Sequence, residues 1–231
     1  MKEMNKMHKI KNKIFSMIGA LSFGMLLCIS IPELPKEKLI EYTISQTENY
    51  VFLGDSITDW YPIEENYKDY PIVNSGKAGY KTKDILDKLE SMVYIYNPTK
   101  IFILIGTNDL NSQTSSKEIL IENIKKIIEN ISENRPNAKI YLESIYPINR
   151  TDNEKIIMST VGKRTNKEIL EVNRQLKNYC IEKNIVYIDM YQELIDEDGN
   201  LKLDYTKDGL HLTNEGYAVV TKKRLQYMQK D

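Results

Sequence analysis

The chain has 231 residues, of which 41% are hydrophobic and 28% are charged, and its formal net charge is -1. This length fits one domain, or one domain with a short appendage, and it can bury a core without disulfide or metal cross-links. The near-zero charge gives no overall basic field, which argues against nucleic acid as a partner. The two cysteines, Cys28 and Cys180, provide neither a disulfide framework nor a metal cluster.

The first 31 residues have the pattern of a targeting or membrane segment. Residues 1–13 carry five lysines and one glutamate, a net charge of +4, and residues 14–31 are eighteen positions without a charge. A basic head before an apolar run is typical of a secretory signal or a membrane anchor. An uncleaved anchor fits the length of the run and the lack of an Ala-x-Ala cleavage site; a cleaved signal and a plain buried helix are the alternatives. The first two predict an extracytoplasmic folded domain, either membrane-anchored or secreted.

After this segment, residues 32–49 are predicted to be a tether and residues 50–231 a folded domain. Apolar, β-branched runs predict strands at residues 50–53, 71–73, 101–105, 140–144 and 185–189. Apolar residues at helical spacing predict helices near residues 82–92, 116–131, 165–183 and 214–229. This alternation predicts an α/β fold with a parallel sheet covered by helices on both faces.

One predicted connection, residues 145–164, is long for a compact domain. Loops of this length usually carry function or are mobile. We therefore expect this loop to take part in the function or to move.

The segment Gly54-Asp55-Ser56-Ile57-Thr58 follows directly on the first predicted strand. A strand that ends at Gly-Asp-Ser places a serine hydroxyl at the edge of an open α/β sheet, where ligands bind. Serine is unreactive near neutral pH unless the protein supplies a base, a group that orients the base, and donors for the oxyanion. The remaining motifs therefore decide whether Ser56 is a candidate nucleophile.

His211 is the candidate base, since the other histidine of the chain, His8, lies in the basic head. It stands in the motif DGLH at 208–211, where a turn can fold the Asp208 carboxylate back onto the imidazole. Asp208 would then hold the tautomer and stabilise the imidazolium that forms when Ser56 loses its proton. A loop histidine that only caps a turn is the structural alternative.

Two further strand ends carry candidate donors for an oxyanion. Asn108 follows the third strand in GTND at 106–109, and Gly76 follows the second in NSGKAG at 74–79. An asparagine amide can donate to an oxyanion, and a glycine lets a backbone N–H approach a substrate closely. Each of these motifs alone is more typical of a turn. Together with Ser56, Asp208 and His211, they fill each role of an acyl-transfer centre once.

On these motifs the chain resembles the SGNH, or GDSL-type, serine hydrolases over most of residues 50–228. The matching blocks are GDSIT at 54–58, NSGKAGY at 74–80, GTND at 106–109 and DGLHLT at 208–213. The resemblance implies a flavodoxin-like fold: a three-layer α/β/α sandwich with a mostly parallel five-stranded sheet. It also implies that no metal or other cofactor is required.

The same resemblance implies a role for each candidate residue. Ser56 is the expected nucleophile, His211 the general base and acid, and Asp208 the group that orients His211. The expected oxyanion hole consists of the Ser56 and Gly76 backbone N–H groups and the Asn108 side chain.

Residues near these motifs are candidates for the substrate pocket: Trp60, Tyr61, Tyr80, Tyr146 and Leu210. Plain packing is the alternative for these side chains. Three acidic neighbours are expected to satisfy local backbone groups: Asp55, Asp59 and Asp109. The chain has sixteen tyrosines and four phenylalanines, so many of its rings carry a polar end, which suits a polar or carbohydrate leaving group.

The leading prediction is a serine esterase that hydrolyses a small acyl ester, acetyl above all, on an extracytoplasmic carbohydrate through an acyl-enzyme. Cleavage of lysophospholipids or other short-chain lipid esters is the alternative substrate class. The same triad can pass the acyl group to a sugar hydroxyl if water is kept out, with the 145–164 loop as a lid. A binding module with a relic site is the non-enzymatic alternative. The expected partners are the ester substrate and, through an uncleaved N-terminal segment, the membrane.

Overall fold

The computed structural model describes residues 48–113 and 115–229. The expected signal or anchor segment, residues 1–31, and residues 32–47 of the expected tether lie outside these ranges. Asn49, which we expected in the tether, is bonded into the folded domain. Its side-chain amide donates to the Tyr96 carbonyl at 3.0 Å, and its carbonyl accepts from the Thr99 N–H at 2.9 Å. The folded domain therefore begins before Tyr50.

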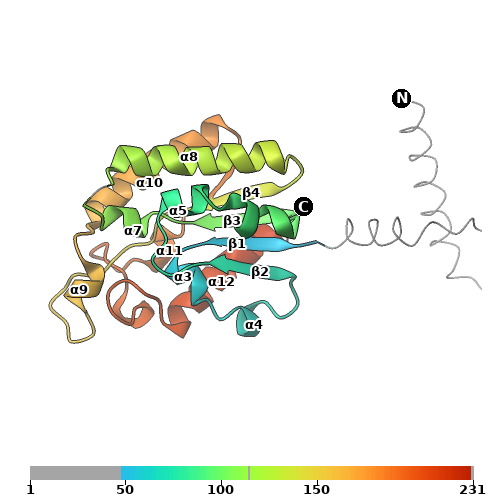
Figure 1. Ribbon diagram of the computed structural model, residues 1–231. Helices are drawn as coiled ribbons and strands as arrows, with labels where there is room; N and C mark the ends of the chain where they lie inside the picture. Colours follow the sequence, from blue (N-terminus) through green and yellow to red (C-terminus); the bar gives the residue numbers. More distant parts are fainter. Residues whose placement is uncertain (1–47, 114, 230–231) are drawn as a thin grey trace, which may run out of the picture. The chain divides into compact units, whose positions relative to one another are not determined.

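The described residues form a five-stranded sheet in which every paired strand is parallel to its neighbour (Figure 1). In chain order, the strands are β1 Tyr50–Gly54, β2 Ile72–Gly76, β3 Lys100–Leu104, β4 Lys139–Glu143 and β5 Val186–Ile188. Their order in space is β2-β1-β3-β4-β5, so the direction of winding changes between β1 and β3. Open α/β sheets bind ligands outside the carboxyl ends of the strands at such a switch point. The predicted parallel, five-stranded α/β fold is confirmed.

Helices cover both faces of the sheet, as predicted. One face packs against α5 Thr82–Leu86, α6 Leu89–Met92, α8 Lys117–Asn134 and α10 Asn166–Glu182. The other packs against α3 Ser56–Asp59, α11 Tyr191–Leu194 and α12 Asn214–Met228. The connections carry short helical segments at α4 Ile63–Asn66, α7 Thr107–Leu110, α9 Met158–Val161, η1 Tyr94–Tyr96 and η2 Leu203–Tyr205.

The alternation of side chains along the strands produces two separate cores. Val51 and Leu53 of β1 belong to a mainly aliphatic cluster with α8 and α10. Tyr50 and Phe52 of the same strand belong to a largely aromatic cluster with α3 and α12. Successive side chains of a strand point to opposite faces, so one buried strand contributes to both clusters. The strand that leads to Ser56 is therefore packed on both of its faces.

Three of the four predicted helices are confirmed, with ends close to the predicted ones, as α8, α10 and α12. Thr213 caps α12 as expected, because its hydroxyl accepts from the N–H of Gly216. The prediction of one helix over residues 82–92 is wrong. Lys88 leaves helical geometry, at φ -130° and ψ 19°, and separates α5 from α6. Ile85 and Leu89 are nevertheless both buried, so packing against the sheet outweighs the continuity of the helix.

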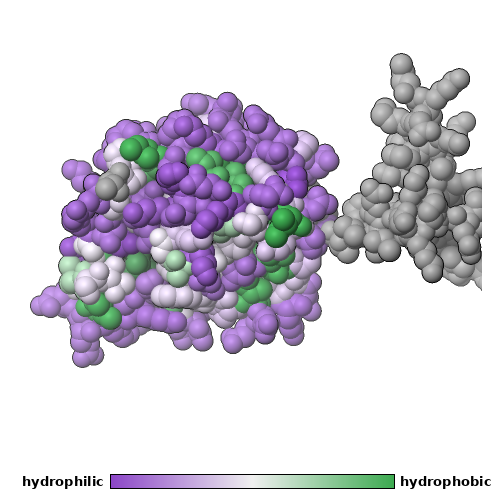
Figure 2. Space-filling view, viewed as in Figure 1, coloured by the Kyte–Doolittle hydropathy of each residue, from purple (hydrophilic) through white to green (hydrophobic). Residues whose placement is uncertain are grey.

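The surface of the folded domain that Figure 2 shows is mostly hydrophilic, with separate hydrophobic patches. Three of the exposed large hydrophobic side chains are Trp60, Ile157 and Met158. Within the described ranges, no helix combines the length and the apolar composition that crossing a bilayer requires.

Candidate active site

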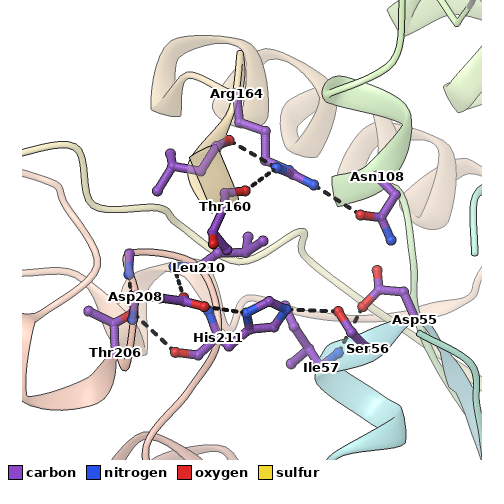
Figure 3. Close-up of polar contacts among 12 residues, drawn as sticks. Asp55, Ser56, Ile57, Asn108, Thr160, Arg164, Thr206, Asp208, Leu210 and His211 are labelled. Carbon is purple, nitrogen blue, oxygen red and sulfur yellow. Dashed lines mark hydrogen bonds and ion pairs between the residues drawn. The ribbon is translucent and has the colours of Figure 1, made fainter. Parts of the chain in front are cut away.

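The structure brings Ser56, Asp208 and His211 together at the carboxyl edge of the sheet (Figure 3). The Ser56 hydroxyl oxygen lies 3.1 Å from Nε2 of His211, and Nδ1 of His211 lies 2.6 Å from Oδ2 of Asp208. Both distances are those of hydrogen bonds. An imidazole held between a hydroxyl and a carboxylate in this way can take the proton of the hydroxyl during acyl transfer.

Ser56 owes its position to the residues on either side of it. Asp55 caps the short helix α3, because its Oδ1 accepts from the N–H of Ile57 at 3.0 Å. Gly54 is required before it, since a Cβ at this position would lie 2.2 Å from Oγ1 of Thr58 and 2.5 Å from the Leu104 carbonyl. The chain therefore turns from β1 into α3 in close contact with β3, and Ser56 is the first residue after the turn.

Asp208 is fixed by the turn that carries His211. Its Oδ1 accepts from the N–H groups of Leu210 and His211 at 2.9 and 2.8 Å, while its Oδ2 faces the imidazole. Burial disfavours the ionised carboxyl, but these hydrogen bonds outweigh burial and hold the pKa of Asp208 below its ordinary value. Gly209 makes the turn possible at φ +93°, and a Cβ there would lie 2.6 Å from the Asn149 carbonyl.

Asn108, at the start of α7, has a side-chain amide that is held at both ends. Its Nδ2 donates to the Tyr80 carbonyl at 3.0 Å, and its Oδ1 accepts from Nη2 of Arg164 at 2.9 Å. An amide nitrogen has two hydrogens, so one N–H of Asn108 remains after the bond to Tyr80. Asn108 therefore keeps a donor that can serve an oxyanion.

The structure corrects the expectation for Gly76. Its N–H donates to Oδ1 of Asn74 at 3.0 Å, and a Cβ on Gly76 would lie 2.2 Å from the Asp59 nitrogen. Gly76 is therefore required for close packing of β2 against α3, and its N–H is occupied. Gly79, in the same motif, has φ +80° and open space around it, and its N–H has no acceptor among the described residues. The second glycine of NSGKAG was the signal in the sequence for this alternative.

Comparison with known proteins assigns the family. The profile of the GDSL-like Lipase/Acylhydrolase family matches residues 52–219. The chain belongs to this family. The resemblance found in the sequence is thereby confirmed.

Individual relatives match this chain over different shares of their own length. An N-acylneuraminate cytidylyltransferase of Escherichia coli is 29% identical over 170 residues, which are 73% of this chain and 37% of that protein. The chain thus spans less than half the length of these bacterial relatives. A solved structure from Streptococcus pneumonia, whose name refers to platelet activating factor, is 32% identical, with TM-score 0.73 over 83% of this chain and 92% of that one. An acetyl xylan esterase shares the fold at 20% identity, with TM-score 0.64 over 78% of this chain and 98% of that one.

The predicted pocket residues fall into two groups in the structure. Trp60 is 51% exposed, and its ring lies 4.3 Å from the imidazole of His211 between ring centroids. Tyr80 touches the site through its backbone carbonyl, while its hydroxyl accepts from Nζ of Lys88 at 2.6 Å. Leu210 is buried in the aliphatic cluster. Trp60 is therefore the large ring that stands both beside His211 and in contact with solvent.

For Tyr61 and Tyr146, the prediction of a pocket role is wrong. Both side chains are buried in the aromatic cluster. Tyr61 lies 2.7 Å from the Thr221 hydroxyl and donates to the Tyr217 carbonyl at 3.1 Å, and Tyr146 donates to Glu143 at 2.6 Å. Their hydroxyls are thus engaged in the interior, and the two rings are packing residues.

Of the three acidic neighbours, Asp55 bonds within its own turn, as expected. The expectation of local bonds is wrong for Asp59 and Asp109, which accept from residues 19 and 27 positions away. Asp109 accepts from the N–H and the hydroxyl of Thr82, and Asp59 accepts from the N–H of Ala78. Asp55 is the unusual one, because its second oxygen is buried without a hydrogen-bond partner among the described residues. Burial raises the pKa of Asp55 to about 7, against the opposing effects of the Ile57 N–H and the Arg164 charge.

The long connection over residues 145–164 is bonded to both sides of the site. Asn149 donates its N–H to the Gly209 carbonyl at 2.8 Å, and Ile157 donates to the Asp208 carbonyl at 3.0 Å. At its end, Arg164 reaches Asn108. Sequence reasoning missed Arg164, since an arginine in a loop carries no signal of its own. Within the described ranges, no group of His, Cys, Asp or Glu side chains is arranged to hold a metal ion.

Proposed function

We propose that Ser56 is the nucleophile of a serine esterase, with His211 as general base and acid and Asp208 as the group that orients His211. The observation that carries this assignment is the continuous pair of hydrogen bonds from Ser56 through His211 to Asp208. Ser56 attacks the ester carbonyl as His211 takes its proton, and the protonated His211 then gives that proton to the leaving alcohol. Water releases the acyl group from Ser56 by the same steps in reverse.

The proposed oxyanion hole consists of the backbone N–H groups of Ser56 and Gly79 and the side chain of Asn108. Neither N–H has an acceptor within the described residues, and Asn108 retains one N–H. The bond from Asn108 to the Tyr80 carbonyl also ties the Gly79 turn to the start of α7. Donors fixed in this way stabilise the charge that develops on the carbonyl oxygen in the transition state.

As substrate we propose a small acyl ester, acetyl in the first place, on a carbohydrate outside the cytoplasm. The exposed ring of Trp60 beside His211 offers a flat apolar surface against which a sugar ring can pack. The names of the bacterial relatives refer to an acylated sugar, N-acylneuraminate. The basic head and apolar run of residues 1–31 support the extracytoplasmic location.

Replacement of Ser56 tests the proposed chemistry. Ser56→Ala should lower the turnover of p-nitrophenyl acetate by about four orders of magnitude or more, because a serine hydrolase without its nucleophile retains little activity. Far-UV circular dichroism and the thermal midpoint serve as controls for folding. If Ser56→Ala is folded and hydrolyses the ester at the wild-type rate, the assignment is wrong.

A short-chain lipid ester is the second candidate substrate, favoured by two exposed apolar side chains near the site. Ile157 and Met158 are each about half exposed, and the Ile157 N–H is bonded to the Asp208 carbonyl. Acetate release from acetylated glycans should be compared with fatty-acid release from lysophospholipids. Trp60→Ala should raise KM for a glycan acetate more than for a small aliphatic acetate. Release of fatty acid without release of acetate would overturn the carbohydrate proposal.

A further inference from the structure

Arg164 is a buried cation next to the proposed oxyanion hole, and the proposed mechanism gives it no role. Its side chain is almost inaccessible, with 2% of the residue exposed. The guanidinium donates from Nε to the Thr107 carbonyl at 2.7 Å and from Nη1 to the carbonyls of Thr160 and Val161 at 3.0 and 2.9 Å. Its remaining terminal nitrogen, Nη2, donates to Oδ1 of Asn108 (Figure 3). Arg164 thus joins the end of the 145–164 loop to the start of α7.

These bonds determine which way the Asn108 amide faces. A guanidinium can only donate, so the atom of Asn108 that meets Arg164 must be its oxygen. The Tyr80 carbonyl can only accept, so the atom that meets Tyr80 must be the nitrogen. The opposite orientation of the amide would place nitrogen against Arg164 and oxygen against the carbonyl, and both bonds would be lost. With Arg164 in place, the second N–H of Asn108 has a fixed direction.

The guanidinium is held firmly enough to impose that direction. It is bonded on one side to the backbone of α9 and on the other to Thr107, the residue directly before Asn108. Burial lowers the pKa of Arg164, and the negative charges of Asp55 and Asp208 oppose this lowering and favour the charged guanidinium. A hydrogen bond from a charged donor also polarises the amide that accepts it, which strengthens the N–H of that amide as a donor.

We propose that Arg164 is a positioning residue that orients and polarises the Asn108 side chain for the oxyanion of the transition state. This inference rests on the proposed function, in which Asn108 is an oxyanion donor. Arg164 itself touches no reacting atom. It acts through Asn108, and it makes the 145–164 loop part of the catalytic machinery.

A double-mutant cycle between Arg164 and Asn108 tests the proposal with p-nitrophenyl acetate. Arg164→Met should lower kcat by about 10- to 100-fold and leave KM within about threefold, because the oxyanion forms only in the transition state. Asn108→Ala should lower kcat by about 100- to 1,000-fold. In the Asn108→Ala background, Arg164→Met should change kcat by less than about twofold, since the residue through which it acts is gone. A structural role would instead give independent losses that multiply.

Arg135, at the end of α8, provides a control away from the site. Its guanidinium donates to the carbonyls of Asn134 and Tyr94. Arg135→Met should therefore leave kcat near the wild-type value. Thermal midpoints show which variants are folded at the assay temperature. If Arg164→Met does not fold, Arg164→Lys keeps the buried charge and should show the same non-additivity with Asn108→Ala.

Two results overturn the inference. In one, Arg164→Met lowers kcat by the same factor in the Asn108→Ala background as in the wild-type protein. In the other, Arg164→Met changes KM and leaves kcat unchanged. Ser56→Ala separates this failure from that of the proposed function. If Ser56→Ala abolishes turnover while Arg164 and Asn108 act independently, the esterase proposal stands and the positioning role falls.

Discussion

The two faces of the sheet are built in different ways, although they share the same strands. The face under α8 and α10 is aliphatic, and Ile124, Ile127 and Leu176 are completely buried there. The face under α3 and α12 is packed with aromatic rings and contains the buried ion pair of Arg224 with Glu143. The aliphatic core is therefore held by nondirectional van der Waals packing, and the aromatic core also by directional hydrogen bonds.

The ion pair lies deep in the aromatic cluster. Arg224 donates from Nη2 to Oε2 of Glu143 at 3.0 Å, and its guanidinium carbon lies 4.4 Å from the Phe52 ring centroid and 4.9 Å from that of Tyr61. Glu143 also accepts from the hydroxyl of Tyr146. Both oxygens of Glu143 are thus bonded, whereas Nη1 of Arg224 is buried without a hydrogen-bond partner among the described residues. Removing one member of such a buried pair leaves the charge of the other unpaired.

The candidate active site is built on the aromatic face of the sheet. Ser56 begins α3 and His211 precedes α12, so both belong to the aromatic face. The Tyr217 hydroxyl on α12 donates to the Ile57 carbonyl on α3 at 2.9 Å, and the Tyr61 hydroxyl donates back to the Tyr217 carbonyl. A few tenths of an ångström matter between a nucleophile and its base, and directional bonds fix such positions better than aliphatic packing does. The comparison predicts that removing a hydrogen-bonding group on the aromatic face lowers kcat as well as stability. Removing a comparable group on the aliphatic face should lower stability alone.

The largest expected effect comes from breaking the buried ion pair. Arg224→Met should lower the free energy of unfolding by about 3–5 kcal/mol, because it leaves the Glu143 carboxylate buried and unpaired. Urea denaturation followed by circular dichroism measures this loss. As the control on the aliphatic face, Ile124→Val should cost about 0.5–1.5 kcal/mol. A smaller loss for Arg224→Met than for Ile124→Val would contradict the contrast between the two faces.

The ionisation of Asp55 should make the free energy of unfolding depend on pH. The pKa of Asp55 is about 7 in the folded protein and roughly 3.9 in an unfolded chain, so the folded state holds the proton more tightly. Stability gained from Asp55 is therefore present below about pH 4 and is lost as the pH rises to about 7. Asp55→Asn keeps an acceptor for the Ile57 N–H and removes the charge. The advantage of this variant in unfolding free energy should grow from near zero at pH 4 to about 2–4 kcal/mol at pH 8. Parallel stability curves for the two proteins would refute the assignment.

The smallest expected effect comes from a comparison of two variants that each remove one tyrosine hydroxyl, one on each face. Tyr217→Phe removes the bond to Ile57 on the aromatic face, and Tyr94→Phe removes a bond to the Asn130 carbonyl at 3.1 Å on the aliphatic face. Each should cost about 1 kcal/mol of unfolding free energy. Only Tyr217→Phe should also lower kcat, by about 3- to 10-fold, since α3 carries Ser56. Equal kcat values for the two variants would mean that the aromatic face does not position the site.

Much of the fold was predictable because it depends on local patterns. The apolar residues of α8 recur at helical spacing, and Thr213 caps α12 as its sequence position indicates. The helix predicted over residues 82–92 failed where packing of Ile85 and Leu89 on the sheet outweighed the local pattern. The burial of Tyr61 and Tyr146 could not be predicted either, because the sequence near a motif does not show whether a tyrosine ring faces a substrate or the core.

The sequence by itself determined which residues stand at the carboxyl edge of the sheet, through the strand that leads to Ser56, the turn that joins Asp208 to His211, and the strand end before Asn108. These are short segments whose residues shape their own backbone. Only the tertiary structure decided how these residues are used, because Gly76 packs against the backbone of Asp59 in α3 and Arg164 meets Asn108 across 56 residues of chain. Such contacts depend on how distant segments pack, and no local pattern records them.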